Sequence, residues 1–99
     1  MIEHLTPEHF RPHLQKHFRV QGGRHALELV EVQTSAALDW LKQGLPRQPF
    51  CLIFKGPRGD VLHEGQYFFE VEDGVTFEFY VMPVHTVERD RQDYQAVFN

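Results

Sequence analysis

The chain has 99 residues, of which 41% are hydrophobic and 24% charged, and its formal net charge is −4. These values fit one globular domain over residues 1–99 and exclude a disordered chain. Residues 50–99 carry four Lys or Arg against nine Asp or Glu, which argues against nucleic acid or an anionic membrane as a partner.

Cysteine content and hydropathy bear on the compartment. Cys51 is the only cysteine, so the chain cannot form an internal disulfide. No apolar run is long enough for a membrane helix, and the opening "MIEHLTPEHF" lacks the apolar region of a signal peptide. We therefore expect a cytoplasmic protein.

The first predicted element is a short helix in "LTPEHFRPHLQK", residues 5–16. Thr6 is a good N-cap for a helix that begins with proline. Pro12 should kink or restart this helix, which we expect to end by Lys16. Phe10 and Leu14 are spaced i, i+4 and should form its buried stripe.

A hairpin is predicted next, in "FRVQGGRHALELVEV", residues 18–32. A turn at the two glycines places Phe18 opposite Leu27 and puts apolar side chains of both strands on one face. Val30 is out of phase with Leu29, and a β-bulge near it would restore the alternation.

The middle of the chain holds one ambiguous segment and one clear strand. Residues 35–43 could form a second helix that Ser35 caps and Gly44 ends, or they could be a loop. "PFCLIFKG" is a strand by composition and by its Pro and Gly boundaries. Both of its faces are largely apolar, so we expect a central strand.

The second predicted hairpin is "GQYFFEVEDGVTFEFYVMPV", residues 65–84. A three-residue loop over 72–74, with Gly74 in the left-handed region, separates an apolar face from a mostly polar one. The apolar face comprises Tyr67, Phe69, Val71, Val75, Phe77, Phe79 and Val81. A last strand, "YQAVFN", should point Tyr94, Ala96 and Phe98 inward.

These elements predict an α+β fold that is mainly antiparallel. It should have about six strands in a roll or partly closed barrel, with the short N-terminal helix covering one end and a possible second helix at 35–43.

Three histidines form one possible metal site. His9, His13 and His17 would share a face of a continuous helix, and histidines so spaced can bind zinc or nickel. Pro12 interrupts that helix, and no cysteine or carboxylate stands at ligand spacing. We therefore expect no metal and no other cofactor, and we interpret the three as surface histidines.

The stretch "CLIFKGPRGD" contains three further motifs, for which we favour structural explanations. Cys51 lies in an apolar strand, where its thiolate would be scarce. A phosphate loop would need a helix after the lysine and glycine, and none is predicted there. The tripeptide at 58–60 resembles an adhesion signal but is explained by a turn.

An acidic patch lies near the second hairpin, but the sequence contains no catalytic pattern. We therefore do not expect the chain to be an enzyme.

Three motifs together are similar to those of a small bacterial domain family of unknown function. They are an N-terminal helix in "LTPEHF", the mid-chain strand "PFCLIFKGP", and the ending "YQAVFN". The resemblance covers almost the whole chain and brings no catalytic residues with it. It implies an association with phage-tail-like or fibre proteins.

The function expected from the sequence is a non-enzymatic protein–protein interaction or assembly module, accessory to such a fibre protein or self-associating as a homo-oligomer. Phe68, Tyr80 and Ile53 lie on outward strand faces and are the candidate interface residues. The alternatives are a small-ligand-binding β-barrel lined by aromatic residues, and a metal-binding protein that uses the histidines.

Overall fold

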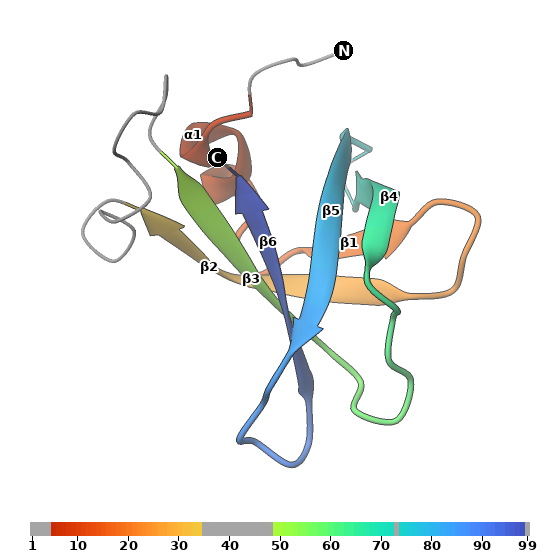
Figure 1. Ribbon diagram of the computed structural model, residues 1–99. Helices are drawn as coiled ribbons and strands as arrows, with labels where there is room; N and C mark the ends of the chain where they lie inside the picture. The colour runs from red at the N-terminus through yellow and green to blue at the C-terminus, as the bar shows by residue number, and fades with distance from the viewer. Residues whose placement is uncertain (1–4, 35–48, 73, 99) are drawn as a thin grey trace.

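Six antiparallel strands of the described chain close into a barrel in the order β1-β2-β3-β6-β5-β4 (Figure 1). The computed structural model describes residues 5–34, 49–72 and 74–98. The predicted helix or loop at 35–43 lies outside these residues. The strands are β1 (His17–Val20), β2 (Ala26–Thr34), β3 (Phe50–Gly56), β4 (Gly65–Val71), β5 (Thr76–Val84) and β6 (Gln92–Phe98). The predicted mainly antiparallel fold with a short N-terminal helix is confirmed.

The helix at the start of the chain is short because of its prolines. It comprises α1 (Pro7–Phe10) followed directly by a 3₁₀ turn, η1 (Arg11–His13). Thr6 caps it, and the backbone N–H of Thr6 donates to His9 Nδ1 at 2.9 Å. The predicted restart near Pro12 is confirmed, since the α-helix gives way to the 3₁₀ turn there.

The helix contributes one buried side chain to the barrel, and the predicted stripe of two is wrong. Phe10 is completely buried, whereas Leu14 is 40% exposed. Leu14 follows the 3₁₀ turn and has left the helix, so the i, i+4 spacing no longer places it on the face of Phe10.

The first hairpin pairs as predicted. Phe18 lies opposite Leu27, and both are buried. The register between β2 and β3 shifts between Leu29 and Glu31, which confirms the bulge at Val30. The bulge allows apolar residues on both sides of it to face the interior.

Strand β3 is central, as predicted, because β2 pairs along one of its edges and β6 along the other. Phe50, Leu52 and Phe54 point into the barrel and are fully buried or nearly so. Their partners on β6 are Phe98, Ala96 and Tyr94, which also face the interior.

The second hairpin has the predicted three-residue connection. Phe69 pairs with Phe77 and Glu70 with Thr76, and Gly74 has a φ of +97°, in the left-handed region. The prediction for Val75 is wrong, because its side chain is 40% exposed. Val75 lies next to the turn, before the strand enters the barrel.

The core is a cluster of rings that fills the barrel. Phe10 lies with its ring centroid 4.7 Å from that of Phe77, 5.5 Å from Phe98 and 6.0 Å from both Phe50 and Phe79. The helix therefore closes one end of the barrel, as predicted, by inserting one aromatic side chain between strands.

Candidate functional site

The outer face of the β4–β5 hairpin exposes two aromatic side chains. Phe68 is 52% exposed and Tyr80 is 42% exposed. Phe68 lies opposite Glu78, and Tyr80 lies opposite Gln66, so the two rings are diagonal neighbours on one face. Strand alternation produces this pattern, because the buried residues of β4 and β5 occupy the intervening positions. We call Phe68 and Tyr80 the aromatic pair.

Acidic side chains surround the aromatic pair. The hydroxyl of Tyr80 donates a hydrogen bond to Glu64 Oε2. This hydrogen bond, with burial and the charge of Glu64, raises the pKa of Tyr80 above its usual value. Gln66 Nε2 donates to Glu78 Oε2 at 3.0 Å, and Glu70 pairs with Arg19 at 2.8 Å.

The third residue predicted for the interface lies elsewhere. Ile53 is on β3, half-buried between Glu31 of β2 and Gln95 of β6. Because β6 separates β3 from β5, the structure brings Phe68 and Tyr80 together but does not bring Ile53 to them.

Sequence reasoning missed Val97, an exposed apolar residue on β6. Its side chain is 42% exposed and points outward between the inward-facing Ala96 and Phe98. The alternation of "YQAVFN" already contained this signal, because a valine in phase with Gln95 must face outward.

The three histidines have separate roles and do not form a common site. His9 bonds with Thr6 at the start of α1, and His17 lies 3.5 Å from Glu72. The interpretation as surface histidines is wrong for His13, because its side chain is only 8% exposed and packs between the rings of Phe18 and Phe77. Within residues 5–34, 49–72 and 74–98, no three His, Cys, Asp or Glu side chains are grouped as a metal ion would require.

Cys51 is a packing residue in the structure. It is fully buried, and Gln95 Nε2 lies 3.1 Å from its Sγ. Burial raises the pKa of the Cys51 thiol, so the reactive thiolate is disfavoured.

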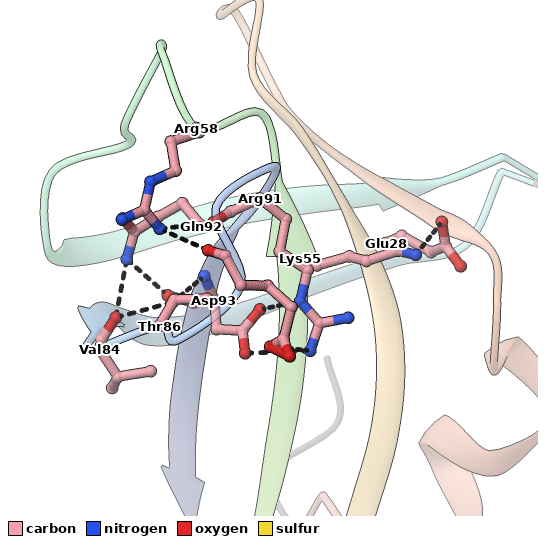
Figure 2. A network of polar contacts seen from close by, with 9 residues as sticks. Glu28, Lys55, Arg58, Val84, Thr86, Arg91, Gln92 and Asp93 are labelled. Atoms are coloured by element: carbon pink, nitrogen blue, oxygen red, sulfur yellow. Dashed lines mark hydrogen bonds and ion pairs between the residues drawn. The ribbon is translucent and has the colours of Figure 1, made fainter.

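Both charged residues of the Arg58–Asp60 tripeptide bond to their own chain. Arg58 Nη1 donates to the carbonyl oxygens of Glu88 and Arg91, each at 2.9 Å (Figure 2). Asp60 accepts two hydrogen bonds from Arg24, at 2.7 and 3.1 Å. The Arg24 hydrogen bond holds the pKa of the Asp60 carboxyl below its usual value, and burial opposes this shift. These contacts support a structural role for the tripeptide.

Next to Arg58 lies an open groove of about 600 Å³, lined mainly by charged side chains. Arg91 Nε lies 2.8 Å from Asp93 Oδ1, and Lys55 Nζ lies 3.9 Å from Glu28 Oε1 (Figure 2). Because these lysine and arginine groups are neutralised by neighbouring carboxylates, the groove does not present a concentrated charge to a ligand.

The chain belongs to a family described as a domain of unknown function (DUF6916), which matches residues 5–98. This family confirms the expected membership of a small domain family without an assigned activity. No curated protein and no solved structure matched the chain. Within the described residues, no helix is long and apolar enough to cross a membrane.

Proposed function

We propose that this domain is a non-enzymatic protein-interaction module that binds its partner through the outer face of the β4–β5 hairpin. The observation that carries the proposal is the exposure of the aromatic pair, 52% for Phe68 and 42% for Tyr80. Aromatic side chains exposed side by side on a sheet are typical of binding surfaces, and Tyr is among the residues that contribute most binding energy.

The carboxylates around the aromatic pair define the chemistry of the partner. Glu64 and Glu78 lie on or next to this hairpin face and accept hydrogen bonds from the neutral groups of Tyr80 and Gln66, so their charges remain. Glu70 lies on the same face, but Arg19 neutralises its charge. A partner surface with apolar residues and flanking Lys or Arg would complement it. The sequence resemblance adds a class of partner, a phage-tail-like or fibre protein.

The alternatives have less support. A ligand within the barrel would need interior space, and Phe10, Phe79 and Phe98 pack there with ring centroids 5.5–6.0 Å apart. A histidine-dependent metal site would need rings that converge, whereas His9 bonds to Thr6 and His17 lies 3.5 Å from Glu72.

The proposal is tested by co-purification of this domain with a candidate phage-tail-like or fibre protein. We expect the double variant Phe68→Ala/Tyr80→Ala to lose about tenfold or more in affinity, as central aromatic contacts do. The matched control is Val87→Ala, because Val87 is 81% exposed in a loop. Equal capture of the wild type and the double variant would contradict the proposal.

Self-association through the same face is measured separately. Light scattering should show whether the wild type is larger than a monomer, and whether the double variant changes that mass. A wild-type dimer that the double variant converts to a monomer would identify a second copy as the partner.

A further inference from the structure

One seam of the barrel is only partly hydrogen bonded. Strand β5 has nine residues, but its pairing with β6 comprises only Met82, Pro83 and Val84. Residues 76–81 pair with β4 along one edge, and among the described strands none pairs with their other edge. Figure 1 shows β5 and β6 close together where β5 ends and diverging toward the C-terminus of the chain.

Side chains close the seam where the backbones diverge. The ring centroids of Phe79 on β5 and Phe98 on β6 are 5.8 Å apart. Phe10 lies 6.0 Å from the first ring and 5.5 Å from the second. These rings seal the interior, so the β5 edge does not need a neighbouring strand to protect the core.

The hairpin register identifies the backbone groups that face the seam. The N–H of Val71 donates to the carbonyl oxygen of Val75 at 2.7 Å. Because hydrogen-bonded and non-hydrogen-bonded pairs alternate in an antiparallel ladder, every second residue after Val75 also bonds to β4. The residues that bond to β4 are Phe77, Phe79 and Val81. The backbone groups of Thr76, Glu78 and Tyr80 therefore point into the seam.

Pro83 fits this alternation. Its position falls in phase with Val81, on the side of β4, but the last β4–β5 pair is Gly65 with Val81. The missing N–H of Pro83 thus costs no ladder hydrogen bond, as strand prolines require. Met82, one residue earlier, pairs across the seam with Gln95.

Exposed apolar side chains flank the open edge. Tyr80 and Val97, one on each side of the seam, are both 42% exposed, and Phe68 on β4 is 52% exposed. Glu78 stands on the edge itself, with its side chain outward. Two copies paired through this edge would place both Glu78 carboxylates in one short ladder, and like charges facing each other are destabilising there. Charge therefore favours a basic partner over a second copy.

We propose that the β5 edge from Thr76 to Tyr80 accepts, by strand addition, an extended segment of another protein that alternates apolar and basic side chains. The inference rests on the proposed function and names its binding mode. The added strand bonds to the backbones of Glu78 and Tyr80, while its outward side chains pack against the Tyr80 ring and approach the Glu78 carboxylate.

The first test is amide exchange in the free protein. The amides of Glu78 and Tyr80 should exchange much faster than those of Phe77 and Phe79, which bond to β4. Equal protection at these four positions would overturn the proposal, because the edge would already be covered.

The second test uses synthetic peptides as probes. A peptide of alternating lysine and valine should bind about tenfold or more tightly than its glutamate–valine counterpart. It should also slow exchange at Glu78 and Tyr80.

N-methylation of every second peptide residue removes backbone donors but keeps the side chains. Two such peptides are possible, one methylated at the odd positions and one at the even positions. One of them should lose binding, and the other should retain it. Equal binding of both methylated peptides would refute strand addition.

A variant of the protein provides the matched test. Glu78→Pro removes a donor that faces the seam, whereas Phe79→Pro removes one that bonds to β4. We expect E78P to remain folded but no longer bind the lysine–valine peptide, whereas F79P should unfold. The peptide panel decides the question independently if E78P does not fold.

These results separate the two proposals. Unchanged binding of both methylated peptides, with loss of partner capture in the Phe68→Ala/Tyr80→Ala variant, would refute strand addition and leave the interaction face standing. If the peptide protects the Glu78 and Tyr80 amides and the double variant still captures the partner normally, strand addition at β5 is supported. Binding of the partner through the aromatic pair is then refuted.

Discussion

Replacing Phe10 by alanine should severely destabilise the domain. Phe10 is completely buried and is the only buried residue of α1. Its ring lies within 6.5 Å, centroid to centroid, of Phe18, Phe50, Phe77, Phe79 and Phe98. The variant removes the side chain that closes one end of the barrel and leaves a cavity between strands that cannot easily collapse.

The size of the loss follows from comparable core truncations. Phe→Ala in a core costs about 3–5 kcal/mol in the free energy of unfolding. A domain of this size has a total stability of about 5–15 kcal/mol, so the variant should lose a large part of it. At about 4–8 °C per kcal/mol, the midpoint of thermal unfolding should fall by roughly 12–40 °C.

The assay is urea and thermal unfolding followed by circular dichroism, with Leu14→Ala as the control. Leu14 lies four residues later and is 40% exposed, so we expect L14A to cost less than about 1 kcal/mol. A loss below about 1 kcal/mol for F10A would refute the reasoning. It would mean that the helix can detach while the barrel remains folded without its plug.

Three further changes test the packing and the electrostatics of the fold. Gly56→Ala should cost about 1–3 kcal/mol in the free energy of unfolding, because its Cβ would lie 2.9 Å from Cδ2 of the buried Leu27. Cys51 should react with a thiol reagent only as fast as the protein unfolds, because it is fully buried and its pKa is raised. Asp60→Asn should destabilise the protein at neutral pH, and this difference should vanish as pH falls, because the Asp60 pKa is lowered in the folded state.

Each of these three has an outcome that contradicts it. An unchanged unfolding midpoint for G56A would show that Leu27 repacks freely. Rapid modification of Cys51 in the folded protein would show an accessible thiol. For Asp60, the folded pKa lies below the unfolded one, so its stabilisation is present above the unfolded pKa and lost as pH falls through the folded pKa. A difference between D60N and wild type that persists in acid would exclude the hydrogen bond from Arg24 as its cause.

Local sequence patterns determine which side chains of each strand face the core and which are exposed. The alternation of "FCLIF" and "YFFEV" decides which side chains face the core. The bulge at Val30 follows from one phase error in the alternation of "ALELVEV", where Val30 is out of phase with Leu29. The exposure of Phe68 and Tyr80 belongs to the same class of inference. These features depend on the two-residue period of a strand, which neighbouring residues alone define.

Only the tertiary structure decided how these elements meet. The closure of β1 against β4, the plug at Phe10 and the bond from Arg24 to Asp60 join residues far apart in the chain. The open edge at Glu78 is a further example, because it exists only where β5 and β6 diverge around packed rings. That divergence depends on how β5, β6 and the rings between them pack together, and the pattern of a single strand contains no information about it.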